Sequence, residues 1–318
     1  MSGTAPASAM EALGARTRAG TWLGAIVEAS KPGITRLVTI TSAMGFALAA
    51  AGRRWEAAEL AIVAACCLVG TALSAAGANT LNQWMERARD ARMPRTRRRP
   101  IPRGSLSPSA AAWSGAALAA FGVVTLWAGC GWAPAMVSAA TTLIYLIAYT
   151  PLKPVTPLAT LVGAVPGALP PIIGYTAAAG SAGLSSPMAW VLFAIMFVWQ
   201  IPHFLAIAWL YREDYEAGGF RVLPVVDPTG RRTARSILLW SAALIPVSMA
   251  PAAWMDRAPG VAFALITFFM GAAFLMLGLR LVRTQDRADA RRAFFASIIH
   301  LPLLLVAVVA FSLVSIVF

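Results

Sequence analysis

Charged residues are scarce in this sequence. Only 12% of its 318 residues are Asp, Glu, Lys or Arg, while 59% are hydrophobic. Soluble domains usually carry about 25% charged and about 45–50% apolar residues. Charge this sparse indicates that most of the chain lies in a solvent that rejects charge, and the composition therefore argues against an ordinary water-soluble domain.

The sequence has only three cysteines and shows no secretory signal. Cys66 and Cys67 are adjacent within an apolar run and Cys130 lies elsewhere, so the three cannot form a disulfide framework and are interpreted as small core residues. Residues 1–20 are rich in Ala, Ser and Gly and lack an apolar run before a cleavage site. We expect residues 1–30 to form a disordered N-terminal tail and residues 31–318 to form one transmembrane domain.

The few charges cluster, which leaves seven long runs without charge: 37–52, 60–85, 104–152, 154–211, 236–255, 258–279 and 293–318. A helix needs about 20 apolar residues to cross a bilayer, so the third and fourth runs are each long enough for two helices. Gly and Pro break these two runs at residues 129–134 and 180–187. The pattern predicts an all-α, polytopic membrane bundle of about nine transmembrane helices around a central cavity, with the first helix beginning near Ile34.

The basic residues are divided unevenly between the two ends of these helices. With nine spans, the N-terminus and the loops after spans 2, 4, 6 and 8 share one side, which holds 23 of the 26 Lys and Arg residues. Because basic residues accumulate in cytoplasmic loops, we expect the N-terminus to be cytoplasmic and the C-terminus to lie on the opposite side, most simply in a bacterial inner membrane. This distribution explains the net charge of +13 without a nucleic acid partner.

The end of the second span carries the first group of candidate site residues. Asn82, Glu86 and Asp90 are spaced by four residues, which places three oxygen-bearing side chains on one helical face. Mg²⁺ prefers oxygen ligands and commonly bridges a few carboxylates to substrate phosphates. A helix end with Glu–Arg pairs would show the same spacing, so the stripe alone does not decide between the two interpretations.

A basic loop follows this stripe and favours the metal interpretation. Eight arginines fall within residues 87–103, more than membrane orientation needs. Arg binds phosphate oxygens through a bidentate fork, so Arg95 and Arg99 are candidates for binding a diphosphate. Tyr149 and Lys153 close span 4 on the same side and are candidates for the same role.

A second polar group follows span 6. Asp214 lies four spans after the first stripe, so both acidic groups are expected to open to the same side of the membrane. His203 lies within the apolar span itself, where a polar side chain is costly and is a functional candidate. The non-functional alternatives are an ordinary solvated loop for Asp214 and a hydrogen bond to a neighbouring helix for His203. His300 is interpreted as structural.

Several segments together resemble one family. Residues 82–100 read Asn-x3-Glu-x3-Asp-x2-Met-x-Arg-Thr-x2-Arg-Pro, residues 199–204 read Trp-Gln-Ile-Pro-His-Phe, residues 214–224 read Asp-Tyr-x3-Gly-x3-Leu-Pro, and residues 149–153 read Tyr-Thr-Pro-Leu-Lys. This combination is similar to the heme O synthases (protoheme IX farnesyltransferases), a branch of the UbiA-type prenyltransferases. The sequence departs from the family pattern in three places: Glu86 replaces Asp, Arg221 replaces Pro, and Ala159 replaces Asn.

The resemblance implies an activity and a set of ligands. It implies transfer of a farnesyl group from farnesyl diphosphate to the vinyl group of heme B, with addition of water, giving heme O and diphosphate. It implies an imidazole contact from His203 to heme, and a downstream heme-modifying enzyme or an assembling terminal oxidase as partner. Mg²⁺ would be held by Asn82, Glu86, Asp90 and Asp214, and the diphosphate by Arg95, Arg99, Lys153 and Tyr149.

Three other functions are weighed against this one. A UbiA-type prenyltransferase acting on an aromatic quinone precursor would share the acidic motifs but not the segments around His203 and Arg95. A transporter with an anion site predicts charges deep within several spans, and these spans have almost none. A non-catalytic heme-binding assembly factor would explain His203 but not two acidic motifs.

Overall fold

The computed structural model describes residues 21–317, and these form an all-helical bundle. Within them, nine helical segments are long and apolar enough to cross a membrane. The protein is therefore a multi-pass integral membrane protein, as the charge-free runs predict. The nine spans are Pro32–Ala51, Ala57–Asp90, Pro108–Cys130, Trp132–Leu152, Ala159–Ser185, Pro187–Leu210, Arg231–Trp254, Arg257–Thr284 and Arg287–Ser315.

Most spans consist of one continuous helix. These are α2 (Pro32–Ala51), α3 (Ala57–Asp90), α4 (Pro108–Cys130), α9 (Pro187–Leu210), α13 (Arg257–Thr284) and α14 (Arg287–Val317). The seventh span joins α12 (Arg231–Met249) to the 3₁₀ turn η3 (Ala250–Trp254). Both predicted breaks are present: α4 ends before Gly131, at φ 92°, and α8 ends before Gly180, at φ 65°. Glycine adopts such angles without the steric penalty of a side chain.

Spans 4 and 5 are irregular. Span 4 runs through α5 (Trp132–Leu143), the π-helical turn η1 (Ile144–Tyr149) and α6 (Thr150–Leu152). Span 5 is divided into α7 (Ala159–Ala168), α8 (Pro170–Ala179) and the 3₁₀ turn η2 (Gly180–Ser185). Proline lacks the N–H that an interior helix position donates, so Pro170 and Pro171 explain why span 5 breaks there.

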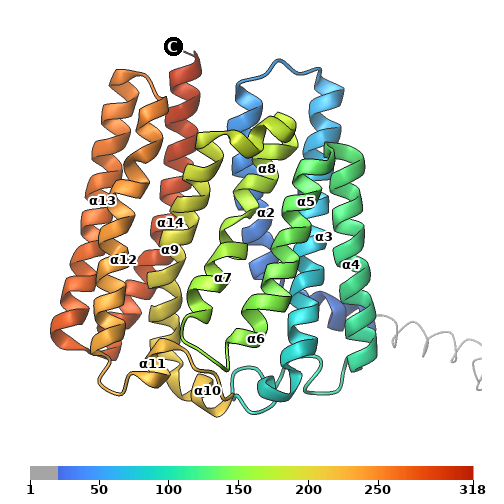
Figure 1. Ribbon diagram of the computed structural model, residues 1–318, viewed down its shortest axis with the longest axis vertical. Helices are drawn as coiled ribbons and strands as arrows, with labels where there is room; N and C mark the ends of the chain where they lie inside the picture. Colours follow the sequence, from blue (N-terminus) through green and yellow to red (C-terminus); the bar gives the residue numbers. More distant parts are fainter. Residues whose placement is uncertain (1–20, 318) are drawn as a thin grey trace, which may run out of the picture.

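Two groups of helices lie on either side of span 5 (Figure 1). In one group α3 packs on α4, and in the other α12 packs on α13 and on α9. α2 packs mainly on α8, and α7 packs on α9, so span 5 joins the groups. The close approach of α3 to α4 depends on glycine: a Cβ at Gly77 would lie 2.3 Å from the backbone nitrogen of Ala119. Small residues allow membrane helices this proximity.

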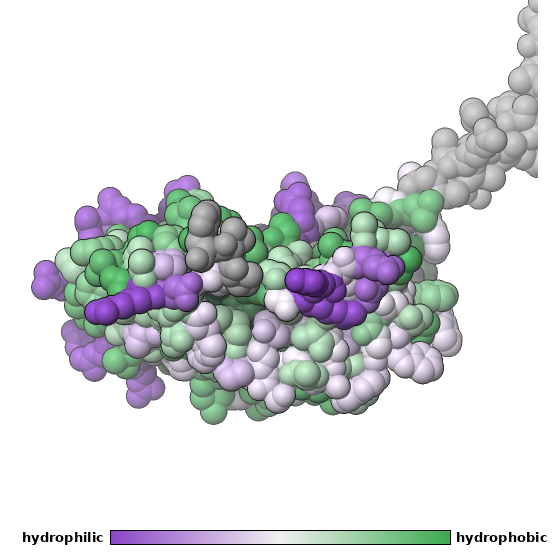
Figure 2. Space-filling view, turned by 90° about the horizontal axis from the view of Figure 1, so that it is seen from above, coloured by the Kyte–Doolittle hydropathy of each residue, from purple (hydrophilic) through white to green (hydrophobic). Residues whose placement is uncertain are grey.

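The loops at one end of the bundle are longer and more structured than those at the other. The loop of residues 91–107 lies there with the short helices α10 (Arg212–Ala217) and α11 (Leu223–Val226), at the lower end in Figure 1. We call this end the arginine-rich end. α14 ends at the opposite end, which Figure 2 shows from above with its hydrophilic residues in separate groups.

The N-terminal segment differs from expectation in the part that the structure describes. Residues 21–29 are helical, and Ala25 and Ala29 are buried against Ile101, Leu106 and Ala111. Residues 21–30 are therefore an ordered part of the domain and not a disordered tail, because two small apolar side chains pack on the loop after α3. The rest of the expected tail, residues 1–20, lies outside the described residues.

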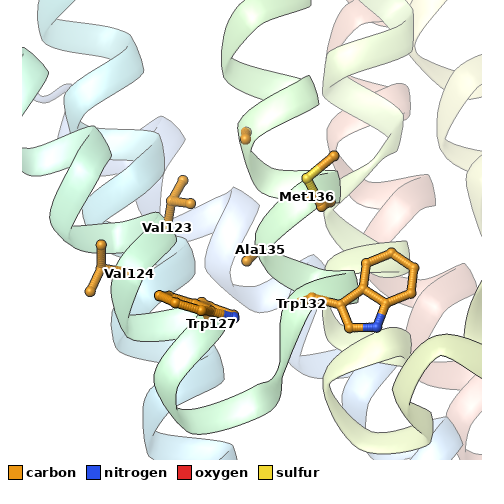
Figure 3. Close-up of a pocket in the computed structure, with 7 residues that line it drawn as sticks. Val123, Val124, Trp127, Trp132, Ala135 and Met136 are labelled. Atoms are coloured by element: carbon orange, nitrogen blue, oxygen red, sulfur yellow. The ribbon is translucent and has the colours of Figure 1, made fainter.

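An apolar groove lies far from the arginine-rich end. It has a volume of about 240 Å³ and is lined by side chains of α4 and α5, among them Trp127, Trp132 and Met136 (Figure 3). Its position beside the turn between α4 and α5 places it near the opposite end of the bundle. It therefore takes no part in the site described below.

Candidate functional site

The last turns of α3 carry a stripe of buried polar side chains at the arginine-rich end. Asn82, Glu86 and Asp90 lie on one face of the helix and are 1%, 7% and 0% exposed. Burying a carboxylate is costly unless a partner compensates its charge. The partners of these three side chains therefore determine what the site can bind.

Each carboxylate of the stripe is paired with a cation. Nη1 of Arg99 donates to both carboxylate oxygens of Asp90, at 2.8 and 2.7 Å. Nζ of Lys153 lies 2.8 Å from Oε1 of Glu86. Arg99 reaches the stripe because the loop folds back on α3, where the hydroxyl of Thr96 donates to the backbone carbonyl of Asp90. The loop and the end of span 4 thus form a cationic rim over the stripe.

The irregular end of span 4 positions Lys153. Its Nζ lies 4.5 Å from the centre of the Tyr149 ring, which the π-helical turn η1 carries. That ring lies against α7, where a Cβ at Gly163 would come within 2.5 Å of it. Burial lowers the pKa of Lys153, but Tyr149 and Glu86 raise it more, so the pKa lies above its usual value. Lys153 therefore stays charged at neutral pH.

Lys31, which was not among the predicted site residues, completes the cationic rim. Its Nζ donates to Oδ1 of Asn82 at 2.8 Å, and Nδ2 of Asn82 donates to Oγ1 of Thr150 at 3.1 Å. Burial, with the charges of Arg99 and Lys153, lowers the pKa of Lys31 to about 7. Three cations therefore lie close enough together to repel one another.

A signal for Lys31 is present in the sequence. Lys31 and Lys153 are the two lysines among 26 basic residues, and a proline follows each. Lysine presents a compact point charge, whereas arginine presents a planar fork. Both lysines reach the same stripe, so this rare residue type marks the site.

The second acidic motif lies at the same end of the bundle. Asp214 is on α10, and its Oδ2 lies 3.8 Å from Nε of Arg95 in the loop after α3. The end of α3 also contacts the residue after α10, where Nη1 of Arg89 donates to the carbonyl of Gly218 at 3.4 Å. The structure thus brings Arg95 and Asp214 together at the end of the bundle where the stripe on α3 lies.

The departures at Arg221 and Ala159 have different structural settings. The backbone N–H of Arg221 donates to the carbonyl of Lys153 at 2.9 Å. Proline, usual for the family at this position, has no N–H and could not make this bond. The bond ties the segment after α10 to the end of span 4. Ala159 is buried at the start of α7 and supplies no polar atom from its side chain.

The donor set suits Mg²⁺ only when a ligand supplies further oxygens. Within residues 21–317, no group of three or more His, Cys, Asp and Glu side chains is close enough to hold a metal ion. The buried donors on α3 are hard oxygens, the type that Mg²⁺ prefers, and Mg²⁺ commonly uses one or two carboxylates plus substrate phosphates. The residues therefore fit Mg²⁺ bound together with a diphosphate.

His203 lies apart from the stripe, on the side of α9 that contacts α14. Its ring stacks on Trp199 and Phe294, with ring centres 4.8 and 5.2 Å away. Its Nδ1 lies 2.7 Å from Oγ of Ser297. His300, by contrast, is 6% exposed and packs against Phe274, which fits its structural interpretation.

The hydrogen bonds of Ser297 assign the protons of the His203 ring. The Ser297 hydroxyl donates to the carbonyl of Phe294 at 2.6 Å. Because a hydroxyl has one proton, Ser297 accepts from His203, and the neutral ring then carries its proton on Nδ1. The lone pair of Nε2 remains available, which is the form of imidazole that binds a metal.

Comparison with known proteins gives the class of this protein. The model of the UbiA prenyltransferase family matches residues 38–299, and the chain belongs to this family. Within it, the chain is similar to curated protoheme IX farnesyltransferases. The one from Solibacter usitatus is 45% identical over 237 residues, which cover 74% of this chain and 80% of the relative. The one from Opitutus terrae is 38% identical over 292 residues, covering 89% and 92%. The predicted family is confirmed.

Solved structures share the fold. A digeranylgeranylglyceryl phosphate synthase aligns with a TM-score of 0.73 at 13% identity, over 92% of this chain and 98% of that one. A UbiA homolog from Archaeoglobus fulgidus bound to GPP and Mg²⁺ aligns with a TM-score of 0.64 at 14% identity, over 90% and 99%. At these identities the likeness concerns the fold alone, and it confirms the predicted all-α membrane bundle.

Proposed function

We propose that the protein transfers a farnesyl group from farnesyl diphosphate to a vinyl group of heme B, with addition of water, giving heme O and diphosphate. The observation that carries this proposal is the meeting of both acidic motifs with one cationic rim, in a chain whose curated relatives are protoheme IX farnesyltransferases. The Arg95–Asp214 contact joins the two motifs.

The residues at the arginine-rich end would bind the diphosphate. Asn82, Glu86, Asp90 and Asp214 would hold Mg²⁺ together with phosphate oxygens. Bound there, Mg²⁺ supplies positive charge that stabilises the leaving group. Arg95, Arg99 and Lys153 would exchange their carboxylate partners for phosphate oxygens, and the Tyr149 ring holds Lys153 in place for this.

The chemistry follows from this placement. The C1–O bond of farnesyl diphosphate breaks, and its electron pair leaves with the diphosphate, which the fixed cations stabilise without reorganising. The allylic cation is attacked by the π electrons of the vinyl group. Water adds to the resulting heme-stabilised cation and releases one proton. The apolar spans behind the stripe would shield the allylic cation from earlier capture by water.

His203 would contact the acceptor. The Ser297 bond leaves Nε2 with a lone pair, and histidine nitrogen is a common ligand of heme iron. Trp199 and Phe294 hold the ring between them. His203 thereby gives the heme a contact distinct from the diphosphate site.

The charge distribution and the proposed activity also bear on the location and partners of the protein. The excess of basic residues at the arginine-rich end supports a cytoplasmic position for that end, in a bacterial inner membrane. A heme-modifying enzyme or a terminal oxidase under assembly would take the product. A non-catalytic heme-binding factor is disfavoured because it has no use for the buried acidic stripe.

The direct test is turnover by the purified protein in nanodiscs. Heme B, farnesyl diphosphate and Mg²⁺ are supplied, and heme O is identified by mass. A parallel reaction replaces heme B with 4-hydroxybenzoate, an aromatic quinone precursor. Heme O in the first reaction supports the proposal. Prenylation of the benzoate without formation of heme O would reject heme as the acceptor.

A further inference from the structure

Lys31 occupies an unusual backbone position at the entrance to the first span. Its φ of 51° and ψ of 70° lie in the left-handed region of backbone conformation. Among the non-glycine residues of 21–317, only Lys31 and Gln285 have a positive φ. Side chains disfavour this region, and such residues persist where the surrounding structure holds them. Here the backbone N–H of Lys31 donates to the carbonyl of Glu28 at 3.1 Å.

The N-terminal segment fixes the direction of the Lys31 side chain. Nε2 of Gln83, a buried residue on α3, donates to the carbonyl of Ala29 at 2.7 Å. Glu28 forms an ion pair with Arg103 at 2.6 Å. The segment is thus attached both to α3 and to the loop after it, directly before Lys31. The chain turns at Lys31 with its Nζ directed at Asn82.

Charge pairing distinguishes Lys31 from the other cations of the site. Arg95, Arg99 and Lys153 each form an ion pair with a carboxylate. In the part of the chain that the structure describes, Nζ of Lys31 donates to the neutral amide of Asn82 and forms no ion pair with a carboxylate. A partly buried ammonium without a bonded counter-ion is costly. An anion that entered the site would supply the missing counter-charge.

We propose that Lys31 binds the diphosphate of the prenyl substrate, because among the described residues Lys31, Arg95, Arg99 and Lys153 it alone forms no ion pair with a carboxylate. This inference rests on the proposed function and extends it to a residue of the N-terminal segment. Lys31 stands beside Asn82 at the far end of the stripe from Arg99, so the diphosphate is held from two elements that precede and follow α3. The ordered segment 21–30 thereby becomes part of the binding site.

The test measures binding of an unreactive substrate analogue, farnesyl thiodiphosphate, with Mg²⁺, to the full-length protein in nanodiscs. Lys31→Met removes the charge and the donor. Lys31→Gln removes the charge but keeps an N–H that can donate to Asn82, and Lys31→Arg keeps the charge. Arg36→Met is the matched control, because Arg36 is an exposed cation on the same helix. Farnesol, which lacks the diphosphate, measures binding of the prenyl chain alone.

We expect Lys31→Met and Lys31→Gln to weaken thiodiphosphate binding about tenfold or more, as for loss of a charge-assisted hydrogen bond. Lys31→Arg and Arg36→Met should stay within about threefold of the unchanged protein, and farnesol binding should not change. Restored binding in Lys31→Gln would assign Lys31 a structural role at Asn82 and overturn the proposal. Unchanged binding in folded Lys31→Met would also overturn it.

Failure of the proposed function would look different. If the unchanged protein bound thiodiphosphate but formed no heme O, heme B would be rejected as the acceptor. The role of Lys31 would then still be decided by the binding measurements. If the unchanged protein did not bind thiodiphosphate at all, both proposals would fall together. Thermal unfolding of each variant identifies one that does not fold, and Lys31→Gln then replaces Lys31→Met as the charge-removing variant.

Discussion

Nε of Arg95 lies 3.8 Å from Oδ2 of Asp214, and this contact joins two loops that four spans separate. The guanidinium also lies over the rings of Tyr211 and Tyr215, at 5.1 and 6.0 Å. Arginine–aromatic contacts and an ion pair together restrict where the side chain can point. Arg95 is therefore placed to bind a ligand that both loops share.

Replacing Arg95 tests whether the junction binds substrate. We expect Arg95→Met to raise the KM for farnesyl diphosphate about tenfold, because a charge-assisted contact with phosphate is lost. Arg97→Met is the control, since Arg97 is an exposed arginine of the same loop. It should change KM less than about twofold. Equal effects of both substitutions would mean that the loop attracts substrate by charge alone.

A double substitution separates the structural and catalytic roles of the Glu86–Lys153 pair. Breaking a buried ion pair on one side leaves an uncompensated charge and costs about 3–5 kcal/mol. We therefore expect Glu86→Gln and Lys153→Met each to lower thermal stability, and the double variant to recover much of it. None of the three should form heme O. Glu59→Gln, on the same helix but in an exposed ion pair, should keep both stability and activity.

The pH dependence of this pair follows from the raised pKa of Lys153. A lysine whose pKa is raised in the folded state contributes stability that is fully present below its unfolded pKa of about 10.4 and is lost only as the pH rises through the folded pKa. The unchanged protein, Glu86→Gln, Lys153→Met and the double variant together give the coupling energy between Glu86 and Lys153. This coupling energy should therefore be equal at pH 7 and pH 9. A clear decrease by pH 9 would contradict the predicted direction of the shift.

Ser297 provides a test of the heme contact that does not depend on turnover. We expect Ser297→Ala to weaken heme B binding several-fold and to shift the Soret band, because the proton on Nδ1 of His203 and the ring orientation lose their partner. His203→Ala should have a larger effect on the same band. His300→Leu should leave the Soret band unchanged. A shift of the band in His300→Leu would indicate that His300, and not His203, contacts the heme.

The spans were predictable because their signal is compositional and does not depend on packing. The breaks at Gly131 and Gly180 followed from residue types that end helices wherever they occur. The order of residues 21–29 was not predictable in this way. Ala25 and Ala29 are weakly apolar, and their burial depends on Ile101 and Leu106, which are distant in the sequence.

The candidate site was predictable where its residues share a helix and not where the chain folds back. The spacing of Asn82 and Asp90 is a property of α3 alone. The contact of Lys31 with Asn82 depends on a backbone turn at φ 51°, which no local pattern indicated. Pairing within the site, such as Arg99 with Asp90, likewise required the loop geometry.

The ion pairs of Glu86 and Asp90 predict the order in which Mg²⁺ and the diphosphate bind. Glu86 and Asp90 are paired with Lys153 and Arg99, so Mg²⁺ alone would have to displace a cation before binding. A diphosphate offers those cations new partners and offers Mg²⁺ phosphate oxygens. We expect calorimetry to detect little Mg²⁺ binding to the protein alone and clear binding once farnesyl thiodiphosphate is present. Removal of Mg²⁺ with EDTA should abolish formation of heme O, and added Mg²⁺ should restore it. Tight binding of Mg²⁺ without the thiodiphosphate would show that the carboxylates leave their cations more easily than their burial suggests.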